Sequence, residues 1–488
     1  MAIIAILLEP ASLLLTTVLI LCLWWMSTRR PPGLPPGPGP ALPLLGHLHL
    51  LDKDPRPKFR EWRRQYGDVF SLYMGGRLVV VLNGYHVIKE ALVKHADAFS
   101  DRPNTFAFEI CRDRGITGTS GVKFKEQRKV SLEILRHLGM GKNVLAERIQ
   151  EEVAQYIKAL HSHQGQPVDL REMTKASISN NICSILFGRR FEYDDPEFTR
   201  YLAMVADTLK SASGTALLNF FPWLKHLPGD LFNFKKVLSM THLIETTFLR
   251  PQLDNHILNH TNGNTSDFIH AYIVEIQKRR DSGQATSVDE DNLQQLIRDF
   301  FFAGTETTAT AICWALVYIL HRPEVQDKCY KEIQRVVGTE NAPSMLHKQK
   351  LAYVEATVME HGLACDVNFQ GHVLPKDTMV LPFLESVLHD SELWENPLSF
   401  RPERFIGPDG KLTKPDEFIP FSTGRRLCVG ESLARMELFL YLATMIQHFR
   451  FLPPEDGQLP SLEGVLGLTH SPKPFHIRAV PRTQTLKL

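Results

Sequence analysis

The sequence has few cysteines, and their spacing excludes a disulfide framework. Seven cysteines are scattered over 488 residues, and no Cys-x-x-Cys pair occurs. An odd number of widely spaced cysteines argues against a zinc site as well, and it favours a reducing compartment. An excess of one charge is also lacking, because 55 lysines and arginines balance 54 aspartates and glutamates. We therefore expect no nucleic-acid partner.

Flexible internal linkers are missing too. No Gly/Ser-rich stretch and no block of like charges divides the chain, and 43% of its residues are hydrophobic. A chain of this composition can bury a large core. We therefore predict one large domain over residues 46–488.

The chain begins with a long apolar segment. From Ala2 to Met26 the only charged residue is Glu9, and this length is enough to cross a bilayer core of about 30 Å. A cleaved signal peptide is the alternative, but it needs a basic start and a small-residue cleavage site, whereas Trp24 and Trp25 stand near the end. We predict a retained transmembrane anchor over residues 1–27.

Residues 28–45 are predicted to be a basic and proline-rich linker. Arg29 and Arg30 follow the apolar segment directly, and positive charge at that place is held on the cytosolic side of a membrane. The prolines from Pro31 to Pro40 prevent both helix and sheet. The body of the chain is then expected in the cytosol.

The body of the chain is predicted to be mainly helical. Two alternating stretches, Val69 to Tyr73 and Leu78 to Leu82, flank Met74-Gly75-Gly76-Arg77 and indicate a β-hairpin. Beyond the hairpin, apolar residues recur with the helical period in Val87 to His95, Phe124 to Leu138, Leu145 to His161, Met173 to Leu186, Asp289 to Leu320, Pro323 to Val337 and Cys428 to His448. The fold class is mainly α with a small β portion.

One aromatic stretch breaks the helical pattern. Between Leu217 and Phe234, large apolar side chains crowd around Pro222, Pro228 and Gly229. Such a stretch either caps a core or dips into membrane lipid, and the sequence favours neither.

The most informative motif surrounds the last cysteine. Residues 421–430 read Phe-Ser-Thr-Gly-Arg-Arg-Leu-Cys-Val-Gly, and a helical pattern follows from Glu431. Cys428 therefore stands just before a helix N-terminus, where free N–H groups and the positive end of the dipole favour the thiolate. A thiolate is the axial ligand that helps a haem iron to cleave an O–O bond. The alternative is a buried structural cysteine.

The neighbours of Cys428 suit the same role. Gly424 permits a tight turn, and Gly430 lets the backbone approach a flat macrocycle closely. Arg426 can contact a haem propionate, and Phe421 can shield the sulfur. We predict that Cys428 is the iron ligand and that this loop holds the cofactor.

A second motif lies in the longest predicted helix. Residues 303–308 read Ala-Gly-Thr-Glu-Thr-Thr. Glycine inside a helix costs about 1 kcal/mol, and a threonine hydroxyl can bond back to a carbonyl one turn earlier. A helix weakened in this way either makes room for a ligand or crosses another helix through its small residues.

Together the two motifs resemble those of the cytochrome P450 superfamily. Residues 421–430 fit the pattern FxxGxRxCxG, and residues 303–308 resemble AGx[DE]TT. The order of features along nearly the whole chain is similar to the microsomal branch, family 2 in particular. The resemblance implies the cytochrome P450 fold, haem b (iron protoporphyrin IX) as cofactor, and a location at the endoplasmic reticulum membrane with the catalytic domain in the cytosol.

The resemblance also implies roles for individual residues. Thr307 and Glu306 would be the positioned hydrogen-bond donor and the proton-relay acid, beside the dioxygen groove opened by Gly304. Arg102 and Arg128 resemble positions that pair with haem propionates.

One position near these arginines departs from the family. Phe124 stands where the family's WxxxR motif has tryptophan, and phenylalanine offers no indole N–H to the haem. We expect weaker haem retention for this reason. The same stretch is locally basic, through Lys123, Lys125, Arg128, Lys129 and Arg136. It is either a docking face for an acidic flavoprotein reductase or an ordinary solvated face.

A conserved element of the family is missing. Family members carry Glu-x-x-Arg on a helix that precedes the final sheet, but neither Glu355 nor Glu360 has an arginine three residues later. No arginine at all occurs between Arg335 and Arg401, and the strand pattern resumes at Val367 to Gly371 and Lys376 to Pro382. By ordinary element lengths, about 15 residues are absent.

The absence affects a later loop. In the family an arginine of this loop pairs with the Glu-x-x-Arg helix, and here it corresponds to Arg404 in Phe400 to Phe405. We expect Arg404 to have a carboxylate neighbour at best, and an unpartnered buried charge costs about 3–5 kcal/mol. The hypothesis that follows is poor haem binding.

Two functions remain. The first is a haem-dependent monooxygenase that inserts one oxygen atom into a lipophilic fatty acid, steroid or xenobiotic, with NADPH-cytochrome P450 reductase and cytochrome b5 as partners. The second is an internally deleted, catalytically impaired and haem-poor scaffold. A peroxidase or electron carrier is disfavoured, because such proteins do not require the groove from Gly304 to Thr308.

Overall fold

The structure is a computed structural model, and it confirms a mainly helical chain with small sheets. It describes residues 10, 12, 14–19, 22, 32–103, 105–106, 110–259, 266–359, 374, 378–467 and 469–482. The chain divides into two compact units. The first contains Met1–Phe99, Cys365–Asp390 and Ser422–Arg425, and the second contains Ser100–Ala364, Ser391–Phe421 and Arg426–Leu488.

The first unit is built around a three-stranded sheet. The β-hairpin predicted from sequence is confirmed as β1 (Val69–Met74) and β2 (Arg77–Leu82), which pair antiparallel, and β4 (Met379–Pro382) runs parallel to β2. Four consecutive residues of β2, from Val79 to Leu82, are buried, which suits a central strand of β-branched residues. The helix α3 (Arg56–Tyr66) packs on β1.

The helix predicted from Val87 to His95 is present in this unit but is not uniform. It begins as α4 (Tyr85–Lys89), continues as a π-helical turn η2 (Glu90–Lys94), and α5 (Ala96–Phe99) follows. The short helix α17 (Glu385–Leu388) completes the first unit.

The second unit holds most of the helices. They are α7 (Gly121–His137), α8 (Asn143–His161), α9 (Arg171–Phe187), α10 (Pro196–Ala212), α11 (Phe234–Ile244), α12 (Arg250–Leu258), α13 (Phe268–Asp281), α14 (Glu290–His321), α15 (Pro323–Val336), α16 (Ala352–Met359) and α18 (Glu431–His448). Shorter 3-10 and π-helical segments are η3 (Ser213–Asn219), η4 (Pro222–His226), η5 (Glu245–Leu249), η6 (Lys348–Lys350) and η7 (Pro402–Phe405).

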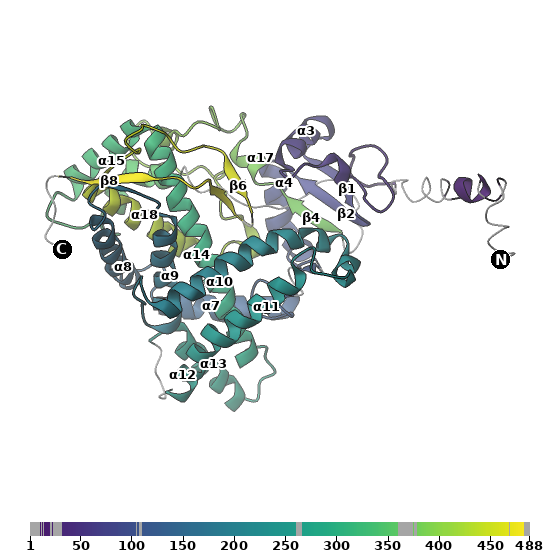
Figure 1. Ribbon diagram of the computed structural model, residues 1–488, viewed down its shortest axis with the longest axis horizontal. Helices are drawn as coiled ribbons and strands as arrows, with labels where there is room; N and C mark the ends of the chain where they lie inside the picture. Colours follow the sequence, from purple (N-terminus) through teal and green to yellow (C-terminus); the bar gives the residue numbers. More distant parts are fainter. Residues whose placement is uncertain are drawn as a thin grey trace. The chain divides into compact units, whose positions relative to one another are not determined.

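The helix α14 is the central element of this unit. It packs against α9, α15 and α18 (Figure 1). Its start is fixed by Asp289, whose side chain accepts a hydrogen bond from the backbone N–H of Asn292 over 2.7 Å. Among the residues that the structure describes, α14 is the one helix long and apolar enough to cross a membrane, and 50% of its apolar window is buried in protein. Its packing makes it a core helix.

Small sheets border the helices of the second unit. The strands β3 (Pro167–Val168), β8 (Ile477–Pro481) and β5 (Phe449–Leu452) form one antiparallel sheet, and β6 (Gly464–Leu466) pairs with β7 (His470–Pro472). The indole N–H of Trp314 donates to the carbonyl oxygen of His470 over 2.7 Å, which fixes β7 against α14.

Two predicted regions lie largely outside the described residues. Of the anchor predicted over residues 1–27, a few helical residues are described, and Leu14, Leu15 and Leu19 among them are exposed. The division into anchor, linker and domain stays a prediction. The strand expected from Val367 to Gly371 and the candidate Glu360 also lie outside the described part, which resumes fully at residue 378.

Candidate active site

A cavity opens in the second unit between α7, α9, α14, α18 and two pieces of the chain before α18, Phe421 and residues 426–430. Its volume is about 280 Å³. Most of its wall is apolar, through Ile116, Phe124, Leu135, Leu138, Met140, Leu145, Ile182, Ile185, Leu186, Phe300, Ala303, Val429, Leu433 and Ala434. Predicted site residues on the same wall are Arg102, Arg128, Gly304, Thr307, Phe421, Arg426, Cys428 and Gly430.

Cys428 reaches the cavity from the loop that ends at α18. Its backbone N–H donates to the carbonyl oxygen of Phe421 over 3.1 Å, which closes the loop. Its side chain is exposed because the cavity opens onto it, although protein surrounds it elsewhere. Burial raises the pKa of the Cys428 thiol, while the backbone N–H groups of Gly430 and Glu431 bond to it and lower that pKa.

The two glycines of the loop, Gly424 and Gly430, have different structural roles. A Cβ atom on Gly430 would lie 4.0 Å from the sulfur of Cys428, so this glycine leaves the backbone close to the thiol. Gly424 has a φ of +75°, and a Cβ atom there would clash with the carbonyl oxygen of Leu92 in the first unit. The turn predicted at Gly424 is therefore confirmed.

Arg426 is held rigidly at the cavity wall. Its guanidinium donates to the carbonyl oxygens of Ser100, Ile116 and Thr119 over 2.7, 3.0 and 2.6 Å. It also stacks over the ring of Phe124, with 3.4 Å from its central carbon to the ring centre. Burial, together with nearby positive charge, lowers the pKa of Arg426 to about 9.

The nearby charges are Arg102 and Arg128. Arg128 donates to the carbonyl oxygen of Leu427 over 2.6 Å, and burial lowers the pKa of both guanidiniums. Three cations, Arg102, Arg128 and Arg426, thus share one wall, and Arg148 also lines the cavity. The carboxyl groups on the cavity offer little compensation, because burial raises the pKa of Asp299 and raises that of Glu437 to about 8. The cavity therefore suits an anionic ligand.

Thr307 and Gly304 lie on the opposite, α14 side of the cavity. The hydroxyl of Thr307 donates to the carbonyl oxygen of Ala303 over 2.6 Å, the bond predicted to weaken the helix. A Cβ atom on Gly304 would lie 2.5 Å from the end of the Ile182 side chain in α9. Both interpretations of the motif thus apply, since the glycine borders the cavity and also permits a close helix crossing.

Glu306 is not among the residues that line the cavity. Its carboxylate lies 3.5 Å from the ammonium group of Lys175, and 16% of its side chain is exposed. The structure therefore separates Glu306 from Thr307, although the two are adjacent in sequence.

Two carboxyl groups at the cavity, Asp299 in α14 and Glu437 in α18, were not predicted from the sequence. Glu437 in α18 is buried, accepts a hydrogen bond from the side-chain amide of Asn181 over 3.0 Å, and contacts the hydroxyl of Thr308. The one signal in the sequence is a glutamate inside the apolar run from Met436 to Ile446.

The residues of this cavity fit a haem group. A haem has a flat apolar ring, a metal that takes an axial ligand, and two carboxylates, and the wall offers apolar side chains, the Cys428 thiol and the guanidiniums of Arg102, Arg128 and Arg426. This donor set favours the haem enzyme over the haem-poor scaffold.

Arg404 is stabilised differently from what the sequence predicted. Its guanidinium donates to the backbone carbonyl oxygens of Glu395, Asn396 and Ser399 over 3.1, 3.2 and 2.6 Å. The expected unpartnered charge is therefore wrong, because these carbonyl oxygens accept hydrogen bonds from the guanidinium. Glu355, the candidate glutamate that is described, is buried and lies 3.2 Å from the ammonium group of Lys348.

Known proteins similar to this chain cover almost its whole length. Cytochrome P450 2U1 of Homo sapiens is 37% identical over 96% of this chain and 94% of the relative. Cytochrome P450 2J2 of Homo sapiens is 37% identical over 97% of both chains, and cytochrome P450 2D6 of Pan troglodytes is 36% identical over 97% of this chain and 99% of the relative.

The family model for cytochrome P450 matches residues 35–479. The family match, the relatives that align over nearly the whole chain, and the cavity at Cys428 all agree. The chain belongs to the cytochrome P450 family of haem-dependent monooxygenases.

Proposed function

We propose that this chain inserts one oxygen atom from dioxygen into a lipophilic substrate, with electrons from NADPH delivered by a flavoprotein reductase. One observation carries the proposal: the Cys428 thiol, three guanidiniums and Thr307 border the same apolar cavity. A bound haem b would supply the iron at which dioxygen is activated. The residues of the chain hold that cofactor, orient the substrate and transfer protons.

Cys428 is proposed as the axial ligand. The N–H groups of Gly430 and Glu431 already bond to its sulfur and favour the thiolate that a metal needs. Phe421 lies on the same cavity wall, and its ring is held by Arg435, whose guanidinium carbon is 4.9 Å from the ring centre. The ring shields the sulfur from water on that side.

Arg102, Arg128 and Arg426 are proposed to bind the two haem propionates. Their mutual repulsion is relieved when two carboxylates enter the cavity. Arg426 is the best positioned of the three, because its three carbonyl partners and the Phe124 ring fix its orientation before a ligand arrives.

Thr307 and Glu306 are proposed to deliver protons during oxygen activation. The Thr307 hydroxyl faces the cavity and can exchange its bond to Ala303 for one to a ligand. Glu306 is tied to Lys175 at 3.5 Å, so it must leave this ion pair to reach Thr307. Glu437 is a second candidate, because its carboxyl group lies on the cavity and keeps its proton at neutral pH.

The outer face of α7 is proposed as the docking site for NADPH-cytochrome P450 reductase and cytochrome b5. Lys125, Lys129 and Arg136 are exposed on this helix, while Arg128 turns inward to the cavity. A positive face over the cofactor wall suits acidic electron-donor proteins.

The membrane is proposed to hold the chain at two places. The first is the anchor over residues 1–27. The second is the aromatic stretch, where Trp223 is 57% exposed and Leu231 is 74% exposed, which favours lipid contact over capping of a core. Together they support an endoplasmic reticulum location with the catalytic domain in the cytosol.

The substrate is proposed to be a fatty acid, a steroid or a xenobiotic, with fatty-acid hydroxylation preferred. The apolar wall of the cavity suits any of these classes. Product analysis against a panel of lipids, with NADPH and reductase supplied, identifies the class. Turnover with peroxide but not with reductase would contradict the electron route.

The decisive experiment is a reduced carbon monoxide difference spectrum of the purified, full-length chain reconstituted with haem. We expect the Soret band of a thiolate-ligated haem, and we expect Cys428→Ala to lose it. Cys22→Ala is the matched control, because Cys22 is exposed and far from the cavity in sequence, and it should leave the band unchanged. A folded wild-type chain without this band would favour the haem-poor scaffold, and an unchanged band in the Cys428→Ala variant would overturn the ligand assignment.

A further inference from the structure

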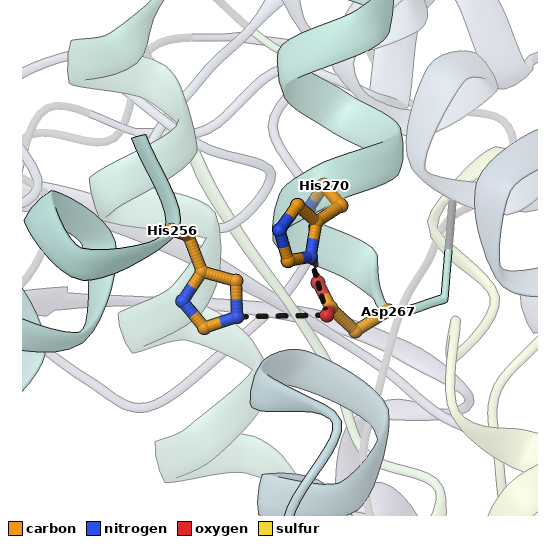
Figure 2. Close-up of side chains that lie close together, drawn as sticks. All are labelled: His256, Asp267 and His270. Carbon is orange, nitrogen blue, oxygen red and sulfur yellow. Dashed lines mark hydrogen bonds and ion pairs between the residues drawn. The ribbon is translucent and has the colours of Figure 1, made fainter. Parts of the chain in front are cut away.

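Two histidines and an aspartate meet in the second unit at residues that do not line the active-site cavity. His256 lies in the last turns of α12, Asp267 caps the N-terminus of α13, and His270 lies in the first turn of α13. His256 and Asp267 are buried, and 12% of the His270 side chain is exposed. Figure 2 shows both imidazole rings turned toward the Asp267 carboxylate.

The distances are those of a compact ligand set. The Nε2 atom of His256 lies 3.5 Å from Oδ2 of Asp267, and the Nδ1 atom of His270 lies 2.6 Å from the same oxygen. One ligand atom from each of the three side chains can be chosen so that all three atoms lie within 4.8 Å of one another. A tetrahedral zinc ion, with bonds of about 2.0–2.2 Å, places its ligand atoms about 3.3 Å apart. His256 already meets this spacing, and His270 must move outward by less than about 1 Å.

The orientation of His256 places one of its ring nitrogens, as a hydrogen-bond acceptor, opposite the acceptor oxygen of Asp267. Its Nδ1 atom lies 2.7 Å from the carbonyl oxygen of Gln252, so the ring donates its proton there. In that tautomer the lone pair of Nε2 points toward the Asp267 carboxylate, an arrangement stable only with a cation between them. A backbone carbonyl that fixes the tautomer is also the usual support for a metal-bound histidine.

A proton is the competing cation. Burial lowers the pKa of His256, but Asp267 and the backbone carbonyls of Gln252 and Phe187 raise it above its ordinary value. The nearby Arg189 bonds to the side chain of Gln252 over 3.1 Å and adds positive charge. A proton on Nε2 of His256 therefore competes with a metal ion for the same lone pair.

We propose that His256, Asp267 and His270 bind a zinc-type divalent cation that joins the end of α12 to the start of α13. Two imidazole nitrogens and one carboxylate oxygen are borderline ligands, which select zinc and neighbouring transition metals over magnesium and calcium. The ion completes its coordination with water, and its role is structural because it joins two helices. The site is independent of the haem iron.

The test uses the full-length holoprotein after treatment with a chelator. Zinc is added at pH 7.5, the excess is removed by dialysis, and the bound zinc is counted by mass spectrometry against the haem content. We expect retention of one zinc per chain and a higher melting temperature, whereas magnesium produces neither. The X-ray absorption edge of the bound zinc should report two imidazoles and one carboxylate, separately from the iron edge.

Matched variants keep the test decisive. Asp267→Asn retains the helix cap, because asparagine caps as well as aspartate, but it removes the charged ligand. Asp267→Asn and His270→Gln should each bind zinc more than about tenfold more weakly while the haem spectrum is unchanged. His226→Gln, at an exposed histidine of η4, should bind like the wild type. Zinc retention that is absent in the wild type at pH 7.5, or equal in all variants, overturns the proposal.

Discussion

The hydroxyl group of Tyr353 donates a hydrogen bond to the carboxylate of Glu403 over 2.7 Å, and this bond joins α16 to η7. Lys328 in α15 reaches the same carboxylate over 2.6 Å. In the family, a Glu-x-x-Arg helix and a loop arginine hold this region together. Among the described residues, Glu403 provides a polar link between this helix and this loop.

The link predicts a loss of stability in Tyr353→Phe. Phenylalanine fills the same space but leaves the Glu403 carboxylate with one donor fewer, so we expect a loss of about 1–2 kcal/mol in the free energy of unfolding. Urea unfolding followed by circular dichroism measures this. Tyr66→Phe, at the end of α3 in the first unit, is the control. A Tyr353→Phe variant as stable as wild type would show that the link contributes nothing.

Glu403 also predicts a pH dependence. Burial raises its pKa, but hydrogen bonds from Lys328 and Tyr353 lower it overall, from 4.5 to about 2. A lowered pKa in the folded state stabilises the protein above about pH 4.5, and this contribution is lost as the pH falls toward 2. Glu403→Gln should therefore be less stable than wild type at pH 6, and the difference should shrink at pH 4. Glu147→Gln, at an exposed position of α8, should show no such trend.

Glu437 predicts a pH dependence of the opposite sign. Burial raises its pKa from 4.5 to about 8, so the folded state holds a proton that the unfolded state releases. Stability should fall as the pH rises from about 4.5 to 8, by a few kcal/mol in total. Glu437→Gln removes this slope. The melting temperature of the holoprotein, measured from pH 6 to 9, checks the prediction, and parallel curves for variant and wild type would contradict it.

The two neighbouring arginines of the cysteine loop should behave differently. Arg426→Lys cannot reproduce the bonds to Ser100, Ile116 and Thr119, so haem should dissociate at least about tenfold faster. Arg425→Lys is the matched control, because Arg425 is exposed and pairs with Asp97. Haem transfer to an acceptor protein measures both rates. Equal rates of haem loss in the two variants would show that Arg426 does not hold the cofactor.

Phe124→Trp should improve haem retention. The ring of Phe124 lines the cavity and lies under Arg426, so the larger indole can extend into open space and offer an N–H to the cofactor. We expect slower haem loss, by a factor of about 3–10, as one added hydrogen bond provides. Phe124→Leu keeps the apolar character without the ring and should lose haem faster. Faster loss from the tryptophan variant would indicate overpacking.

The basic face of α7 should control electron supply. Exchange of Lys125 and Lys129 for glutamate should raise the concentration of reductase needed for half-maximal turnover, more strongly at low salt. Turnover driven by peroxide should not change, since it needs no partner. Lys278→Glu on α13, where the side chain is 76% exposed, is the control. A similar loss in Lys278→Glu would show that the effect depends on net charge and not on the position of the α7 lysines.

Local patterns in the sequence predicted α7, α8, α9, α14, α15 and α18, whereas α3 and the helices from α10 to α13 were not predicted. The period of α14 and the cap at Asp289 are local features, and prediction from sequence placed the ends of this helix to within one residue. The start of α7 at Gly121 was missed, because glycine and Ser120 look like loop residues until their contacts are known. The π-helical turn η2 was not predicted either, because it does not change the spacing of the apolar residues in the sequence.

At the site, sequence motifs identified the residues whose roles depend on their neighbours in the chain. Cys428, Gly430 and Arg426 form one loop, and the structure brings them to one cavity. Glu437 was missed because its importance comes from burial beside α9 and α14, which no local pattern reports. The contact of Glu306 with Lys175 was missed for the same reason.

The close approach of Gly304 to Ile182 ties two properties of the enzyme together. The same glycine borders the cavity and sets how near α9 and α14 come to each other. A larger residue at either position would push the helices apart and reshape the chamber at once. The width of the cavity at Gly304 and the distance between the two helices therefore cannot be changed independently at this position.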